Sequence, residues 1–398
     1  MESLFRAYNR RLEETDSQFF RYLYPTIEWD ERLIGIKGAR GVGKSTMLLQ
    51  HIKRSFPDRS KAFYASLDNI WFSRHPLSEL VEYTYTHGVT HLFLDEVHRY
   101  PGWTQAIKNI YDDYPQLHLV FTGSSLLEID NAEADLSRRL RIYTLDGMSF
   151  REYLELNGVA HLPAISLDEL LTRHMSIAST ITHDLKVLPH FERYFQMGYY
   201  PFYRETSSVE SYFERIQQVV STVIDNDIPA IETIEYETLQ KIKRLIVVLA
   251  QMKPFEPSIQ DLCALLSTTR NQLIRLFSLL DRSALLRLLY YEGKNLKSLG
   301  KPEKILFNNP NLMSALSSEP DTGTLRESYV ASMLSNAHTL NYPRQGDLLV
   351  DGTHLFEVGG KHKGYSQIKD IPDSYIAADD IEIGFGNKIP LWMFGLLY

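Results

Sequence analysis

The sequence predicts an α/β fold for the first part of the chain, in which helices cover a parallel β-sheet. Three observations predict it: short apolar segments alternate with helix-like segments, a glycine-rich loop follows the first apolar segment, and another apolar segment ends in two carboxylates. Parallel strands need crossover connections, and helices usually supply them. We expect strands at residues 33–36, 61–67, 91–94, 117–122 and 142–145.

The glycine-rich loop is the most specific feature. Residues 38–45 read Gly-Ala-Arg-Gly-Val-Gly-Lys-Ser, a full match to the phosphate-loop pattern G-x-x-x-x-G-K-[ST]. The loop lies between an apolar strand and a segment, 46–52, with the spacing of a half-buried helix. Its backbone N–H groups would bind phosphates at a positive helix end. We predict that ATP contacts Gly38, Ala39, Arg40, Gly41, Val42, Gly43, Lys44, Ser45 and Thr46.

Two side chains of this loop and two carboxylates predict the chemistry. Lys44 would reach the β- and γ-phosphates, and Ser45 would be a ligand of Mg²⁺. The strand at 91–94 runs into Asp95 and Glu96. Asp95 would hold Mg²⁺ through water, while Glu96 would orient and polarise the attacking water. Because a kinase needs no such glutamate, the pair favours hydrolysis. The alternative is a strand followed by a solvated acidic turn.

Further candidates follow the strand at 117–122. Thr122 and Ser124 have small hydroxyls that suit sensing of a γ-phosphate, although Ser124 is also a plausible helix N-cap. A basic cluster contains Arg138 and Arg139, either of which would offset transition-state charge in cis or across a subunit boundary. Solvated arginines at a helix end are the alternative, and action in trans would require a homo-oligomer.

The composition bounds the function. The chain has 398 residues, enough for two or three domains, and a net charge of −8, which argues against coating nucleic acid along its whole length. Cys263 is the only cysteine, which excludes an internal disulfide framework and a cysteine-rich zinc site. The sequence contains neither a signal-peptide pattern nor an apolar run of about 18 residues. We therefore expect a cytoplasmic protein without a membrane partner.

We predict three domains: a phosphate-loop domain over 1–155, a helical lid with a winged helix over 156–310, and an α+β domain over 311–398. In the middle, a short helix from Ser258, a turn at 267–269 and a helix over 270–280 form a helix-turn-helix, with a wing over 285–295. The stretch between Ser258 and Lys301 has two possible roles, contact with DNA and packing between domains. The stretch has seven basic residues (270, 275, 282, 287, 294, 297, 301) against three acids (261, 281, 292).

The last domain has a different pattern. Two strands, 347–350 and 354–358, flank a turn, and a helical stretch begins near Glu327. Asp347, Glu357 and Lys361, with Glu327 as a further candidate acid, are similar to the acids and lysine of PD-(D/E)XK nucleases, which bind Mg²⁺ through carboxylates. However, Gly359 stands where that motif has its lysine, so a degenerate nuclease fold is favoured over an active one. The apolar run 391–398 predicts a buried terminal strand.

The chain as a whole resembles the prokaryotic AAA-superfamily ATP-binding proteins that carry a C-terminal nuclease-like domain. The resemblance implies an AAA-type ATPase core, a helical and winged-helix middle and a nuclease-like end. Beyond the phosphate loop it rests on residues 94–100, 121–125, 134–139, 149–154, 301–304 and 356–361.

We therefore expect a Mg²⁺-dependent ATPase that works as a nucleotide-driven switch or motor. Three alternatives remain: a slowly turning-over, nucleotide-gated DNA-binding regulator or defence component, an active nuclease, and a small-molecule kinase. The choice between adenine and guanine and the identity of any protein partner stay open.

Overall fold

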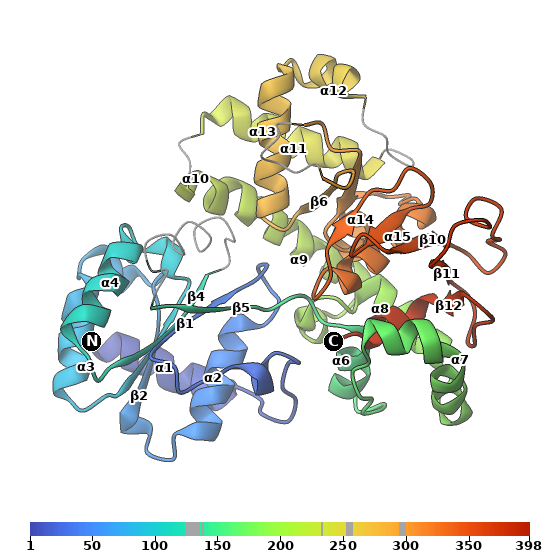
Figure 1. Cartoon of the computed structure of the whole chain (residues 1–398). Helices are drawn as coiled ribbons and strands as arrows, with labels where there is room; N and C mark the ends of the chain where they lie inside the picture. The colour runs from blue at the N-terminus through green and yellow to red at the C-terminus, as the bar shows by residue number, and fades with distance from the viewer. Residues whose placement is uncertain (124–135, 137–138, 232–233, 252–257, 294–299) are drawn as a thin grey trace. The chain divides into compact units, whose positions relative to one another are not determined.

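A computed structural model gives the fold of the chain (Figure 1). The structure describes all residues except 124–135, 137–138, 232–233, 252–257 and 294–299. The chain forms two compact units. The first contains residues 1–147 and 226–233, and the second contains residues 148–225 and 234–398. The sequence-based division into three domains stays a prediction.

The first unit is built on a five-stranded sheet with the strand order β2-β3-β4-β1-β5. All neighbouring strands run parallel, which confirms the predicted class of this sheet. The strands lie where the sequence predicts them: β1 (Leu33–Lys37), β2 (Ala62–Ser66), β3 (His91–Asp95), β4 (His118–Gly123) and β5 (Arg141–Thr144).

The strand order determines which loops meet. β4 pairs with β3 on one side and with β1 on the other, so the carboxyl ends of these three strands lie together. In open parallel sheets, ligands bind outside such carboxyl ends. The residues that follow the three strands therefore form the candidate site.

Helices pack around this sheet (Figure 1). α2 begins at Lys44, within the phosphate-loop motif, and buries Met47, Leu48 and Ile52, which repeat at helical spacing. A short helix, α10, is contributed to this unit by the later segment 226–233. The helices are α1 (Glu2–Glu14), α2 (Lys44–Ser55), α3 (Leu77–Thr86), α4 (Trp103–Asp113) and α10 (Ile228–Ile231).

The second unit begins with helices. Four of the described helices start with a capping box: Ser149 with Glu152, Ser166 with Glu169, Ser208 with Ser211, and Thr269 with Gln272. In each box the N-cap side chain accepts a hydrogen bond from the backbone N–H three residues later, and the side chain of that later residue accepts one from the N-cap backbone. These reciprocal bonds explain why the helices begin at those residues. The helices are α6 (Phe150–Leu156), α7 (Leu167–Asp184), α8 (Val187–Met197), α9 (Val209–Thr222), α11 (Tyr236–Gln251), α12 (Ile259–Leu266) and α13 (Arg270–Arg282).

α12, α13 and a strand pair occupy the region where the sequence predicts a helix-turn-helix and a wing. α13 buries Leu273, Leu276, Phe277 and Leu280, the predicted inner face, while Arg275 is exposed. After α13, strand β6 (Leu286–Leu289) pairs antiparallel with β7 (Lys304–Phe307). Part of the connection between these two strands, 294–299, lies outside the described residues.

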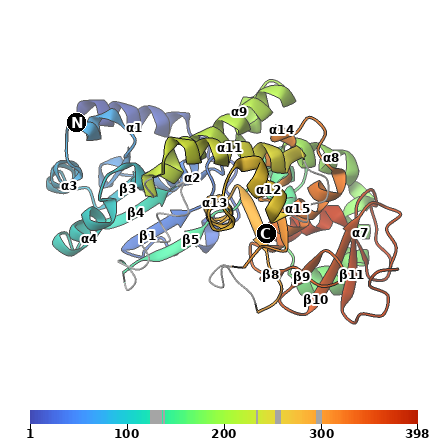
Figure 2. The same ribbon diagram turned by 90° about the horizontal axis from the view of Figure 1, so that it is seen from above.

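The rest of the second unit is a mixed sheet with two helices. The strand order is β12-β11-β10-β9-β8, as Figure 2 shows for β8 to β11. β10 runs antiparallel to β9 and parallel to β11. The elements are α14 (Pro310–Leu316), α15 (Thr322–Leu334), β8 (Leu340–Asn341), β9 (Leu348–Val350), β10 (His354–Gly359), β11 (Ser374–Ala378) and β12 (Lys388–Pro390).

The prediction of a terminal strand is wrong. Residues Leu391–Leu396 form a 3-10 helix, although all six are buried as expected. In a short run of apolar residues, the spacing of the side chains does not distinguish a buried strand from a buried helical turn. The burial of this segment could therefore be predicted, but its conformation could not. None of the described helices is long and apolar enough to span a membrane.

Candidate nucleotide site

The phosphate loop has the backbone that its glycines allow. Gly41 has a φ of 88° and Gly43 a φ of 101°, in the left-handed region that side chains disfavour. Gly43 is also the N-cap of α2, so the loop turns directly into the helix. A Cβ at Gly38 would collide with the backbone oxygen of Leu145. The three glycines of the motif are thus required by local geometry.

Buried cations hold this loop. Arg21, which is 4% exposed, donates to the carbonyl oxygen of Val42 in the loop and, at 2.8 Å, to that of Asp146. Lys44 donates from Nζ to the carbonyl oxygens of Gly38 (2.8 Å) and Ala39 (2.9 Å). Burial lowers the pKa of Lys44, while the nearby charges of Glu96 and Asp95 oppose this shift. A phosphate chain would replace the carbonyls as the partner of this amine.

Asp95 lies at the end of β3 and is 2% exposed. Tyr64 donates to its Oδ2 at 2.6 Å, and Thr122, from the end of β4, makes a short hydrogen bond to its Oδ1. Burial raises the pKa of Tyr64 well above its usual value, and the charge of Asp95 adds to the rise. Tyr64 therefore stays a neutral donor that orients the carboxylate.

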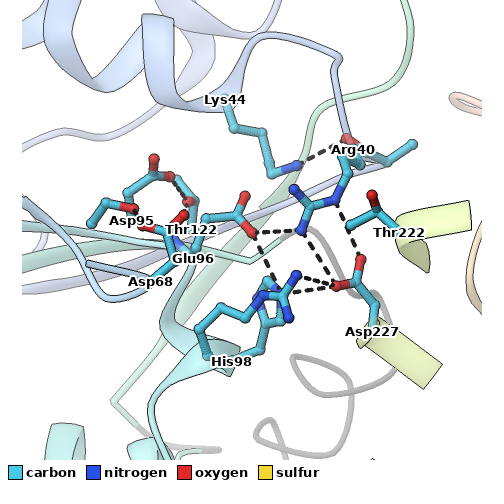
Figure 3. Close-up of polar contacts among 12 residues, drawn as sticks. Arg40, Lys44, Asp68, Asp95, Glu96, His98, Thr122, Thr222 and Asp227 are labelled. Carbon is cyan, nitrogen blue, oxygen red and sulfur yellow. Dashed lines mark hydrogen bonds and ion pairs between the residues drawn. The ribbon is translucent and has the colours of Figure 1, made fainter. Parts of the chain in front are cut away.

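Glu96 is engaged on two sides. Its Oε2 lies 3.1 Å from Arg40 Nη2 and 3.4 Å from His98 Nε2 (Figure 3). Its φ of 54° is unusual for a residue with a side chain, and Thr122 Oγ1 accepts a hydrogen bond from its backbone N–H at 3.3 Å. Strained backbone of this kind is common at functional sites. The predicted water-orienting carboxylate is thus fixed by Arg40 and His98.

Asp227, which no sequence motif indicates, is the third carboxylate beside Asp95 and Glu96. Asp227 is 1% exposed, and its Oδ1 lies 3.3 Å from Arg40 Nη2, 3.3 Å from Arg99 Nη2 and 3.5 Å from His98 Nε2. Burial alone would raise the pKa of Asp227, but the hydrogen bond from His98 and the charge of Arg40 outweigh it, and the pKa is lowered. This buried carboxylate is therefore ionised.

The other predicted residues are distributed as follows. Ser45 and Thr46 lie in the first turn of α2, next to the loop. Ser124 and Arg138 lie outside the described residues. Arg139 pairs with Asp112 at 3.2 Å. Its contact with a nucleotide, in cis or in trans, stays a prediction.

The residues that the sequence predicts to be nuclease-like lie in the second unit. Lys304 Nζ lies 2.8 Å from Glu327 and 3.4 Å from Asp347, so a lysine bridges two of the predicted acids. Glu357 pairs closely with Lys363 rather than with the predicted Lys361, which is exposed. Among the described residues, no group of three or more His, Cys, Asp or Glu side chains is arranged to hold a metal ion. Lys304 and Lys363 are the basic partners of these carboxylates.

This cluster predicts a pH-dependent stability. Burial raises the pKa of Glu327 to about 7, and Asp347 adds to the rise although Lys304 opposes it. The folded state thus binds a proton that the unfolded state releases near pH 4.5, so its stability falls as pH rises from about 4.5 to about 7. We expect wild type to lose about 1–3 kcal/mol more than Glu327→Gln over this window. Urea unfolding at pH 5 and pH 7.5 measures the difference. Equal losses would contradict the assignment.

Comparison with known proteins agrees with the geometry of the first unit. Residues 30–154 match the family model described as an AAA domain. The first unit thus contains a P-loop domain of the AAA type. This AAA domain covers the whole parallel sheet, with the phosphate loop, Asp95 and Glu96. A second family model, described as a domain of unknown function (DUF8612), matches residues 188–323.

Similar proteins include one archaeal relative and several solved structures. The chain is 26% identical to "Uncharacterized protein MJ1637" of Methanocaldococcus jannaschii, over 91% of this chain and 83% of that protein. The Aeropyrum pernix ORC1 protein in complex with DNA is 14% identical, with a TM-score of 0.34 over 79% of this chain and 92% of that one. AMPPCP-bound DnaA from Aquifex aeolicus is 12% identical, with a TM-score of 0.26 over 70% and 88%.

Proposed function

We propose that the protein is a Mg²⁺-dependent ATPase that acts as a nucleotide-driven switch or motor. One observation carries the proposal. The phosphate loop after β1, the carboxylates Asp95 and Glu96 after β3, and Thr122 at the end of β4 lie at the same edge of three adjacent strands. ATP hydrolysis needs a phosphate cradle, a cation site and a water-orienting base within one small region, and this edge supplies candidates for all three.

Each residue of the site has a separate role in the proposed reaction. The loop N–H groups and Lys44 bind the phosphates, and Lys44 offsets the charge that develops on the transferred phosphoryl group. Glu96 orients the attacking water and polarises it. Thr122, which donates to Asp95 and accepts from the Glu96 backbone, links the two carboxylates at the end of β4.

The donor set at this edge fits a magnesium ion. Ser45 supplies a hydroxyl oxygen and Asp95 a carboxylate oxygen, and Mg²⁺ prefers oxygen ligands together with phosphates and water. When bound, the ion would neutralise charge on the β- and γ-phosphates. The measurement that tests the proposal is phosphate release from ATP by the purified chain, with Mg²⁺ and with EDTA. Turnover that EDTA leaves unchanged would refute the metal dependence.

A DNA-binding function is the second candidate, and the α12, α13, β6 and β7 arrangement favours it. Two helices joined by a short turn and followed by an antiparallel strand pair are the elements of a winged helix. Arg270 and Arg275 are exposed on the second helix, and a pocket of about 450 Å³ at its start is lined by Arg270 and Lys301. We propose that this surface contacts DNA phosphates.

Salt dependence tests this second function. Because phosphate contacts release counterions, we expect duplex DNA binding to weaken steeply with salt, and Arg275→Ala to reduce the slope of log K against log salt by about one. Fluorescence anisotropy with a labelled duplex measures both effects. Arg173→Ala, which removes an exposed arginine of α7, is the matched control. A slope that Arg275→Ala and Arg173→Ala change equally would refute the proposed surface.

A further inference from the structure

Arg40 lies inside the phosphate loop, yet its described partners are carboxylates outside the loop. Its guanidinium lies between Glu96 and Asp227, with the amine of Lys44 close by (Figure 3). The Arg40 side chain is 24% exposed, whereas Asp227 is 1% exposed. Burial alone would lower the pKa of Arg40, but Glu96 and Asp227 outweigh it and raise the pKa. The guanidinium is therefore charged and paired with both carboxylates.

In this arrangement Glu96, the proposed base for hydrolysis, is already paired with other side chains. Arg40 and His98 both contact the Oε2 atom of Glu96, one of the two oxygens that could accept a hydrogen bond from a water molecule. A bound triphosphate would bring several negative charges to the loop that carries Arg40. Guanidinium groups bind phosphate oxygens through paired hydrogen bonds, and these are the strong kind. A triphosphate and the two carboxylates thus compete for one guanidinium.

We propose that Asp227 is a positioning residue that competes with the γ-phosphate for Arg40 and so makes the site respond to ATP rather than ADP. This inference rests on the proposed ATPase function and concerns its regulation. Without a γ-phosphate, Arg40 keeps its ion pairs with Asp227 and Glu96, and the pair with Glu96 holds that carboxylate in place. With ATP, Arg40 turns to the γ-phosphate, and Glu96, which keeps His98 as a partner, becomes available to the attacking water. Asp227 keeps its partners His98 and Arg99 in both states, so its charge never lies unpaired.

Asp227 lies in a segment that connects the two units, so the exchange of Arg40 between Asp227 and the γ-phosphate would affect that connection. Asp227 belongs to the segment 226–233, and the chain passes from one unit to the other at both ends of that segment. A pocket of about 310 Å³, lined by Ala230 of α10 and by residues 98–103, leaves space beside the segment. Loss of the Arg40 partner would therefore loosen a segment through which the two units are joined covalently. We infer that this segment carries the nucleotide signal.

Nucleotide affinities test the competition directly. We expect Asp227→Asn to tighten binding of mant-ATP about tenfold, with mant-ADP binding nearly unchanged, because the competitor for Arg40 loses its charge. Arg40→Ala should weaken mant-ATP about tenfold and abolish the preference over mant-ADP, while Arg40→Lys should keep part of it. Asp225→Asn is the matched control, since Asp225 lies two residues away, is 42% exposed and pairs with Lys243. Thermal unfolding identifies any variant that does not fold.

The outcomes separate this inference from the function on which it rests. Wild type that binds neither nucleotide would overturn the proposed ATPase and this inference together. Wild type that binds and hydrolyses ATP, beside Asp227→Asn and Arg40→Ala variants whose ATP/ADP ratios equal that of Asp225→Asn, would overturn the inference alone. If Asp227→Asn does not fold, the ratio for Arg40→Ala decides, because its side chain is partly exposed in a loop.

Hydrogen exchange provides a readout that a purely structural role for Asp227 would not move. We expect mant-ATP, but not mant-ADP, to speed exchange in peptides covering residues 223–231 of wild type. Arg40→Ala should remove this difference, because the residue that transmits the γ-phosphate signal is gone. Equal exchange of these peptides with both nucleotides in wild type would overturn the proposed coupling.

Discussion

Replacement of Glu96 by glutamine should lower ATP turnover at least about 100-fold, the usual contribution of a positioned general base. Glutamine keeps the size of the side chain and one acceptor oxygen, but it does not take up the proton of the attacking water. ATP binding should remain or tighten, because Arg40 loses one of its two carboxylate partners. Steady-state phosphate release and mant-ATP titration measure the two effects separately.

Glu79→Gln is the matched control for the Glu96→Gln prediction. Glu79→Gln changes a half-exposed glutamate of α3 in the same unit, whose partner is His75, and it should leave turnover unchanged. If Glu96→Gln and Glu79→Gln turn over ATP at the wild-type rate, Glu96 is not the water-orienting base. Loss of turnover together with loss of binding would instead show a general defect of the site.

Replacement of Trp392 by alanine should have the largest effect on stability, about 3–5 kcal/mol of unfolding free energy. Trp392 is 1% exposed, its Nε1 donates to the carbonyl oxygen of Glu382 at 3.1 Å, and its own carbonyl oxygen accepts from Tyr329 at 3.4 Å. The substitution leaves a large cavity and removes the indole donor. Urea unfolding followed by circular dichroism measures the loss.

Phe385→Ala is the matched control for this effect. Phe385 is also a large aromatic residue close to the end of the chain, but it is 80% exposed, so its removal should change the unfolding free energy by no more than about 0.5 kcal/mol. An equal, small loss for the two variants would mean that the segment Leu391–Leu396 is not part of the core of the second unit.

Local signals explain why the first unit could be predicted. The five strands are short apolar runs, and the phosphate loop carries its own geometry in Gly41 and Gly43, whose positive φ values no other residue adopts as readily. Asp95 and Glu96 follow such a strand directly. Because each of these residues lies where a strand ends, its place in the fold can be predicted from its place in the sequence.

Asp227 shows what such reasoning misses. It lies 187 positions after Arg40, its partner, and no motif surrounds it. Only the return of the chain to the first unit at 226–233 places it beside the phosphate loop. Similarly, the lysine that neutralises Glu327 and Asp347 is Lys304, which comes from β7 and not from the strand that a motif would indicate. Contacts of this kind depend on tertiary packing, which local patterns do not contain.

The most direct test of the central claim is the rate of phosphate release from ATP with Mg²⁺ by wild type beside Lys44→Ala. Lys44 is 4% exposed and lies in the phosphate loop, where it would bind the β- and γ-phosphates. The ATPase proposal predicts Mg²⁺-dependent turnover by wild type and a loss of at least about 100-fold in Lys44→Ala. Turnover absent from wild type, or equal in the two proteins, would contradict it.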